Sequence, residues 1–157
     1  MNKITQDASF RASCWFCFMV CLGIIASEGV KAMFSWTIQY LSEEGILLVK
    51  SKGEMDVPSA NRMVKDIAEA AVEYQCFSHL IDHRETIFAF NLSDFYDRPF
   101  VNEKLGISRR FQTAMVFSQL TEGTRFMETV FRNRGYDLRH FTDIDEAKAW
   151  LKKQASV

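Results

Sequence analysis

The hydrophobic and polar positions alternate from residue 34 onward in a way that predicts a β-hairpin. Residues 34–41 (FSWTIQYL) place apolar and polar side chains in turn, which is typical of a strand with one buried face. Residues 42–45 (SEEG) have turn composition, and residues 46–49 (ILLV) form a second, more buried strand. The first two elements should therefore pair with each other.

The spacing then changes to a helical period and alternates with short apolar runs. Asp56 and Pro58 are residue types favoured at a helix start, and apolar positions three and four residues apart follow them. The remaining elements that the pattern predicts are a strand over 77–82, a kinked helical segment from Ser93, a strand over 113–117, a helix opening at Thr121, a strand over 136–141 and a helix capped by Thr142. The order ββαβαβαβα predicts an α/β fold, a small mixed β-sheet with an N-terminal hairpin and helices packed on it.

Charged residues gather where the third predicted strand ends. The apolar run over 77–82 leads into Asp82, His83, Arg84 and Glu85. In open α/β sheets, ligands bind beyond the carboxyl ends of strands, so we expect the recognition site of this protein here.

The segment after this loop is expected to be a broken helix. Ser93 precedes Asp94 in a pattern that resembles a helix cap, whereas Pro99 disfavours helical backbone at the residue before it. We therefore expect one short turn near Ser93 and a second helix over 99–104. Aromatic side chains are dense in this segment, and they either close the core or line a groove for a partner or an apolar ligand.

Size and composition predict one compact domain without a nucleic-acid partner. The chain has 157 residues, 48% of them hydrophobic, with 14 Phe and only 2 Pro, which is enough to bury one core without metals or disulfides. Nineteen basic and 20 acidic residues give a net charge of -1, so no global excess of positive charge favours nucleic acid or an anionic membrane.

The N-terminal residues 1–32 form a separate, hydrophobic leader. Residues 12–26 are an unbroken run of apolar and small side chains, shorter than a spanning helix needs. A secretory signal, a short membrane anchor and an upstream stretch preceding a true start at Met33 are three interpretations. We expect the third, with a cytoplasmic domain over 33–157; an exported or membrane-anchored protein is the alternative if residues 12–26 are retained.

The cysteines and histidines do not predict a metal or cofactor site. Cys14, Cys17 and Cys21 lie along one helical stripe of the leader, far in sequence from carboxylates or histidines with ligand spacing. His79 and His83 share a face of the predicted strand, but two histidines lack a third ligand. We expect no cofactor, no metal and no catalytic residue.

Two pieces of the sequence resemble a known family. Residues 53–56 (GEMD) follow a second strand, and a terminal pattern joins residues 133–136 (NRGY), 141–143 (FTD), 146–147 (EA) and 150–151 (WL). Over about 33–153 the chain resembles the SpoIIAA-like, or STAS/SEC14, domains, which are related in fold to anti-sigma factor antagonists and to CRAL-TRIO lipid-binding domains. The resemblance implies a regulatory module or a carrier of an apolar ligand.

The chain departs from the antagonists at the position that carries their regulation. Antagonists have an Asp-Ser pair after the third strand, and a partner kinase phosphorylates the Ser. Here Asp82 is followed by His83, and the nearest candidate is Ser93 before Asp94, in reversed order. A phosphate on Ser93 would be electrostatically permitted at a helix N-terminus, but an ordinary cap is the simpler interpretation.

We therefore expect a non-enzymatic module that binds a partner protein through the loop after the third strand and the helix beyond it, over 84–104. A carrier with an apolar pocket lined by residues 88–100 is the alternative, and an enzyme using Asp82 and His83 is a weaker third. The sequence leaves the oligomeric state open. The candidate contact residues are Asp82, His83, Arg84, Phe88, Phe90, Ser93, Asp94, Phe95, Tyr96 and Arg98.

Overall fold

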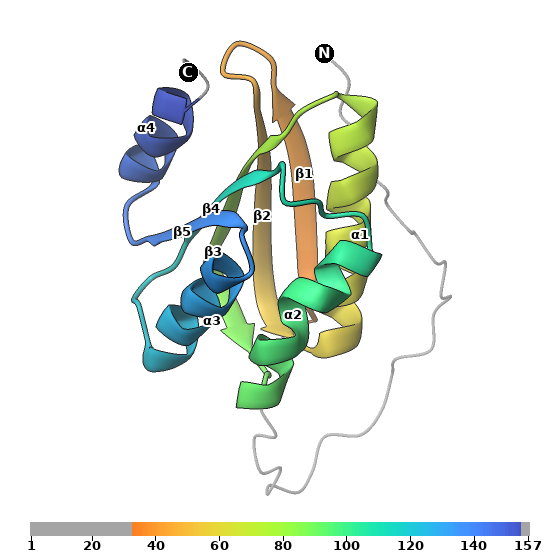
Figure 1. Cartoon of the computed structure of the whole chain (residues 1–157), viewed down its shortest axis with the longest axis vertical. Coiled ribbons are helices and arrows are strands. Elements are labelled where there is room, and N and C mark those ends of the chain that lie inside the picture. The colour runs from red at the N-terminus through yellow and green to blue at the C-terminus, as the bar shows by residue number, and fades with distance from the viewer. Residues whose placement is uncertain (1–32, 155–157) are drawn as a thin grey trace, which may run out of the picture. The chain divides into compact units, whose positions relative to one another are not determined.

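The computed structural model describes residues 33–154, and within them it shows one five-stranded sheet and four helices. The order ββαβαβαβα confirms the prediction (Figure 1). The elements are β1 (Ser35–Leu41), β2 (Ile46–Met55), α1 (Val57–Glu73), β3 (Ser78–Phe88), α2 (Leu92–Lys104), β4 (Gln112–Val116), α3 (Glu122–Asn133), β5 (Asp137–Phe141) and α4 (Ile144–Gln154).

The leader over 1–32, with Cys14, Cys17 and Cys21, lies outside the described residues. Among residues 33–154, every helix is too short or too polar to cross a membrane.

The strands follow one another across the sheet in chain order. β1 and β2 form the predicted antiparallel hairpin, in which Leu41 lies opposite Ile46. β2, β3, β4 and β5 run parallel to one another, so each connection between them carries a helix. β3 is consequently the central strand.

The helices cover both faces of the sheet and bury two clusters of apolar side chains. On one face α1, α2 and α3 enclose the larger cluster, which includes Leu47, Ile67 and Phe131 (Figure 1). On the other face α4 packs on β3, β4 and β5, where Leu80, Val116 and Leu151 are fully buried. Burying each such side chain contributes about 1.5–3 kcal/mol to folding.

The third strand is longer than the sequence pattern predicts. The prediction ended it at Asp82, whereas β3 continues to Phe88 because β2 also extends, to Met55, and pairs with it to the end. Pairing with β4 does stop at Asp82, opposite Val116. The charged cluster therefore lies inside β3, beyond the end of β4, and the loop comes after Phe88.

The second helix is continuous, so the prediction of a break at Pro99 was wrong. α2 runs from Leu92 to Lys104 with Pro99 inside it. The proline ring is fully buried, and its carbonyl accepts a hydrogen bond from Tyr136 Oη at 3.1 Å. These contacts offset the missing backbone hydrogen bond, which costs about 3 kcal/mol in an exposed helix.

Candidate functional site

Asp82 and Arg84 form an ion pair on β3 that is joined by two side-chain hydrogen bonds. Arg84 donates from Nε to Asp82 Oδ1 at 2.9 Å and from Nη2 to Oδ2 at 2.7 Å, and its backbone N–H donates to Oδ1 at 3.2 Å. Burial, the largest influence, raises the pKa of Asp82, but the hydrogen bonds and charge of Arg84 together lower it below its ordinary value. The carboxylate is thus ionised and occupied.

His83 is an interior residue held by hydroxyl groups and aromatic rings. Its Nδ1 lies 2.7 Å from Ser51 Oγ, which also lies 2.7 Å from Thr86 Oγ1. The imidazole lies at contact distance from the rings of Phe88 and Phe117, with centroids 5.1 and 5.6 Å apart, and is 3% exposed. Burial lowers the pKa of His83 to about 4, so the ring is neutral at pH 7.

These two residues do not combine into a reactive pair. The carboxylate of Asp82 is engaged by Arg84, and the ring of His83 turns to Ser51 inside the core. A general acid or base must reach the proton that it transfers, and His83 has almost no exposed surface. Among the described residues, no group of three or more His, Cys, Asp or Glu side chains is arranged to hold a metal.

Most of the aromatic side chains after β3 pack inward. Phe88 and Phe90 meet edge to face with centroids 5.7 Å apart, and Phe95 stacks obliquely on both. Phe95 is buried, and the two others are packed against the larger core cluster. Of the two roles that the sequence left open for these rings, closing the core is the one that the structure shows.

Arg98 is a buried structural residue, in contrast to its expected role at a contact surface. Its Nη2 donates to Asn61 Oδ1 at 2.7 Å and its Nε donates to Asn102 Oδ1 at 3.1 Å. The guanidinium also lies over the ring of Phe90, 5.8 Å from the centroid. Arg98 therefore joins α2 to α1 and is 5% exposed.

The first turn of α2 is capped by Asn91, a residue that the sequence analysis did not select. Asn91 Oδ1 accepts from the backbone N–H of Asp94 at 2.9 Å, and Asp94 Oδ2 accepts from the N–H of Asn91 at 2.8 Å. This capping box places Ser93 inside the first turn, exposed to solvent. Ser93 is accordingly not the cap.

Three large apolar side chains on α2 face solvent. Leu92, Tyr96 and Phe100 are 63%, 55% and 54% exposed and are spaced four residues apart, so they lie along one side of the helix. We call them the α2 stripe. Lys104 Nζ lies 4.2 Å from the ring centroid of Phe100, and the guanidinium of Arg134 lies 4.8 Å from that of Tyr96.

All three residues lie in the segment over 84–104 where contact was expected, but only Tyr96 is among the ten candidate contact residues. The spacing of i, i+4 and i+8 could have predicted a stripe along one side of a helix. The expected break at Pro99 placed Phe100 in a different helix from Leu92 and Tyr96, so the stripe was not predicted. Of the ten candidate contact residues, Arg84, Ser93 and Tyr96 are exposed, three are half-buried and four are buried; the half-buried ones are Phe88, Phe90 and Asp94, and the buried ones are Asp82, His83, Phe95 and Arg98.

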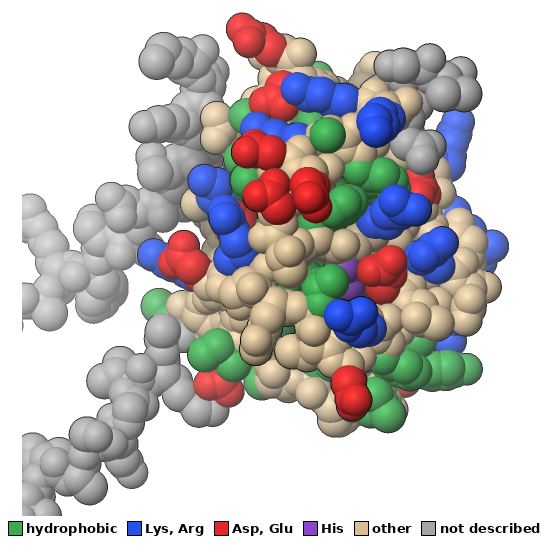
Figure 2. Space-filling model, turned by 90° about the vertical axis from the view of Figure 1, so that its left-hand side faces the viewer, with side chains coloured by type: hydrophobic (Ala, Val, Ile, Leu, Met, Phe, Trp, Pro, Cys, Tyr) green, Lys and Arg blue, Asp and Glu red, His purple; other side chains and the backbone are tan. Residues whose placement is uncertain are grey.

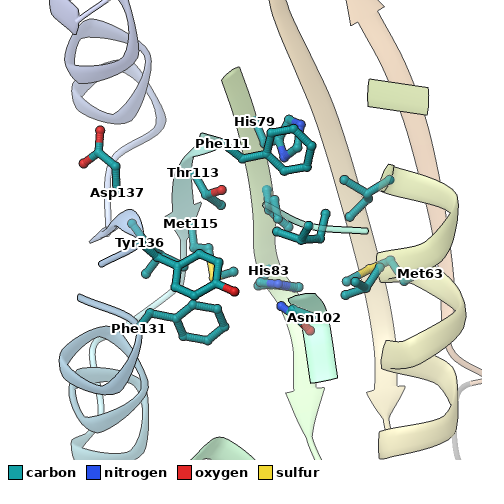
Figure 3. A pocket seen from close by; sticks show the side chains of 15 residues that line it. Met63, His79, His83, Asn102, Phe111, Thr113, Met115, Phe131, Tyr136 and Asp137 are labelled. Carbon is teal, nitrogen blue, oxygen red and sulfur yellow. The ribbon is translucent and has the colours of Figure 1, made fainter. Parts of the chain in front are cut away.

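An enclosed cavity of about 50 Å³ lies on the other side of α2, under the helices (Figure 3). Its walls include His79, His83 and Tyr136, and none of residues 88–100 lines it. This cavity is therefore not the apolar pocket expected over 88–100.

Comparison with solved structures shows a likeness of fold. No family model matches the chain, and no curated protein matches it significantly. A crystal structure of an anti-sigma factor antagonist from Mycobacterium paratuberculosis matches with a TM-score of 0.51 and 15% identity, over 76% of this chain and 95% of that one. The anti-sigma factor antagonist SpoIIAA in its unphosphorylated form matches with a TM-score of 0.45 and 14% identity, over 78% and 98%. The chain has the SpoIIAA-like, STAS type of α/β fold.

Proposed function

We propose that this protein is a non-enzymatic regulatory module that binds a partner protein through the α2 stripe and the loop before α2. The observation that carries the proposal is the exposure of Leu92, Tyr96 and Phe100 on one side of a capped, well-packed helix. The mycobacterial structure with this fold is an anti-sigma factor antagonist, by its name a protein that acts on a regulatory protein.

The stripe has the composition of a protein-binding surface. Tyrosine is enriched among the residues that dominate binding energy, and burying an apolar side chain of this size contributes about 1.5–3 kcal/mol. The side chains are presented by a helix held from below by Arg98 and Phe95, so little conformational entropy is lost when a partner covers them.

The charge distribution supports a protein partner over a nucleic acid. The net charge of the chain is -1, and acidic and basic side chains lie among one another on the face that Figure 2 shows. Nucleic-acid interfaces instead carry a concentrated basic patch.

A carrier of an apolar small molecule is the second candidate, and the cavity size disfavours it. Binding sites for drug-sized ligands are typically about 300–1,000 Å³. The cavity under α2, of about 50 Å³, is several times smaller, so a lipid would have to displace core side chains there. A larger hollow of about 460 Å³ between α1 and the residues after α2 is open to solvent and is lined partly by the charged Lys65, Glu69 and Glu73, which does not suit an apolar ligand. An enzyme using Asp82 and His83 is disfavoured by the closed ion pair and the buried ring. We place the module in the cytoplasm.

The experiment compares which host proteins co-purify with the wild-type protein and with a variant of the α2 stripe. Tyr96→Ala with Phe100→Ala removes two rings that point to solvent, so folding stability should change little. We expect one host protein to be captured by the wild type and lost with the double variant. Binding of that purified protein should then weaken at least tenfold in calorimetry.

Val72→Ala is the matched control, because Val72 is an exposed apolar residue on α1 at 76% exposure. This control should retain the partner at the wild-type level. Equal binding by the wild type and the stripe variant would refute the proposed surface. Co-purification of an apolar small molecule, seen by native mass spectrometry, would favour the carrier instead.

A further inference from the structure

The cavity beneath α2 is enclosed by the sheet and three helices, and its walls are mostly apolar. Residues of β3, β4, β5, α1, α2 and α3 line it, together with residues next to the strands (Figure 3). Its polar members include His79, His83, Asn102 and Thr113, all of them buried. The cavity lies in the core and contains no residue of the α2 stripe.

His79 carries a buried nitrogen that has no partner among the described residues. The side chain is 1% exposed, and its Nε2 makes no hydrogen bond with the protein. A buried polar atom left unsatisfied costs about 1–3 kcal/mol. Some group that can reach the wall of the cavity should therefore satisfy it.

The surroundings of His79 determine which kind of group this is. The imidazole has a hydrogen bond with the backbone of Cys76, and because Nε2 has none, the bond falls on Nδ1. The N–H of Cys76 already donates to the carbonyl of Ala71, so Nδ1–H must donate to the Cys76 carbonyl. Burial lowers the pKa of His79 to about 4, so the ring carries one proton at pH 7. Nε2 is then an acceptor and needs a donor.

A second polar group, Asn102 on α2, lines the cavity and can donate a hydrogen bond. Asn102 Oδ1 accepts from Nε of Arg98, which can only donate, so the oxygen and nitrogen of this amide are distinguished. The NH₂ group of Asn102 remains a donor. A ligand that both donates and accepts would match the two walls.

We propose that this cavity is a binding site for a small neutral molecule with an O–H or N–H donor, which hydrogen-bonds to Nε2 of His79. A volume of about 50 Å³ holds one or two waters or a molecule the size of methanol, because water occupies about 30 Å³ in the liquid. Asp137 is the one Asp, Glu, Lys or Arg residue in the lining, and its carboxylate accepts a hydrogen bond from Gln112 Nε2 at 2.9 Å. The imidazoles are neutral, so a charged ligand would lack a partner of opposite charge and a neutral one is favoured. The site is independent of the proposed partner surface.

The first test is the number of long-lived internal waters, measured by ¹⁷O relaxation dispersion on the intact protein. His79→Phe removes the acceptor and fills its space, so this variant should lose at least one water that the wild type holds. Leu80→Met is the control, because Leu80 is buried on β3 next to His79 but is apolar and does not line the cavity, and this variant should retain that water. An equal number of waters in the wild type and His79→Phe would overturn the proposal.

A second measurement needs no variant, in case His79→Phe does not fold. A long-range ¹H–¹⁵N spectrum of the wild type should show the Nδ1–H form of His79, with the Nε2 shift of a hydrogen-bonded acceptor. The Nε2–H form, or the shift of a bare lone pair, would overturn the proposal.

Methanol and acetonitrile distinguish the sources of the donor, since they are similar in size and only methanol can donate. Saturable shifts of the Asn102 and Thr113 amide signals with methanol alone would show that the site accepts small donors in place of water. No shift with either probe, while the long-lived water persists, would identify water as the ligand. Equal saturation by acetonitrile would refute the requirement for a donor.

Discussion

At the scale of single residues, two side chains of the same type have different roles because one is buried and the other is exposed. Arg98 and Arg84 are fourteen positions apart and look equivalent in the sequence, yet Arg98 is 5% exposed while Arg84 is an exposed residue. Arg98 donates to the amide oxygens of Asn61 and Asn102, whereas Arg84 extends toward solvent and pairs with the buried carboxylate of Asp82.

Replacing Arg98 by Leu should lower the free energy of unfolding by about 2–3 kcal/mol, because the buried amide oxygen of Asn102 and the half-buried one of Asn61 lose their donor. Urea unfolding followed by circular dichroism measures this. Lys65→Leu is the control and should cost less than about 1 kcal/mol, since its ion pair with Glu69 is exposed on both sides. Equal losses in the two variants would contradict a structural role for Arg98.

The candidate site could be predicted from the sequence only in part, because residue types do not reveal which side of an element is covered. The stretch after β3 was correctly selected as aromatic-rich, but Phe88, Phe90 and Phe95 close the core. Leu92 was passed over although it lies in the exposed stripe. Which of these rings faces solvent depends on how α1 and α3 flank α2, and this information is long-range.

At the scale of elements, the periodic patterns predicted the type and order of every strand and helix in the described chain. The errors are the expected break of α2 at Pro99 and several boundaries. β3 continues past Asp82 because β2 supplies a partner strand as far as Met55, with a register irregularity between Lys50 and Lys52. The last helix is another case: Asp143 accepts from the N–H groups of Asp145 and Glu146, so it caps α4 one residue after the expected cap.

The C-terminal end of α2 depends on a glycine in a conformation that other residues avoid. Gly106 has a φ of +101°, and a Cβ built there would lie 3.1 Å from Cβ of Ala68 on α1. Glycine therefore lets the chain leave α2 in close contact with α1.

Gly106→Ala should lower stability by more than 1 kcal/mol, because it adds backbone strain and a close contact. Gly45→Ala is the matched control: Gly45 also has a positive φ, +62°, but open space surrounds its Cβ position. Thermal unfolding should show a clearly larger decrease in Tm for Gly106→Ala. A smaller decrease than in the control would contradict the packing argument.

At the scale of the whole molecule, all three histidines of the sequence are placed in the interior. His79 and His83 lie on β3, and His140 lies on β5, with exposures of 1%, 3% and 8%. Burial lowers the pKa of His79 and His83 to about 4, and burial with the nearby His83 lowers the pKa of His140 to about 3. The folded protein therefore carries all three rings neutral at pH 7.

Because the folded protein holds these three rings neutral, its free energy of unfolding should decrease as the pH falls. In the unfolded chain the histidines have a pKa near 6.5, so between pH 6.5 and 4 the unfolded state binds up to three more protons than the folded state. The contribution of the buried neutral histidines to the free energy of unfolding is fully present above pH 6.5. It decreases as the pH falls toward 4, and His140 continues this loss toward pH 3.

We expect the free energy of unfolding to be constant from pH 8 to 7 and to fall between pH 6 and 4, by up to about 1.4 kcal/mol per pH unit for each histidine. Urea unfolding at fixed ionic strength measures the slope. His140→Leu should reduce the slope by about one proton, although Glu128 Oε2, 3.7 Å from Nδ1 of His140, opposes part of the effect by stabilising a protonated ring. A free energy of unfolding that stays flat down to pH 5 would show that the rings reach solvent and would contradict their interior placement.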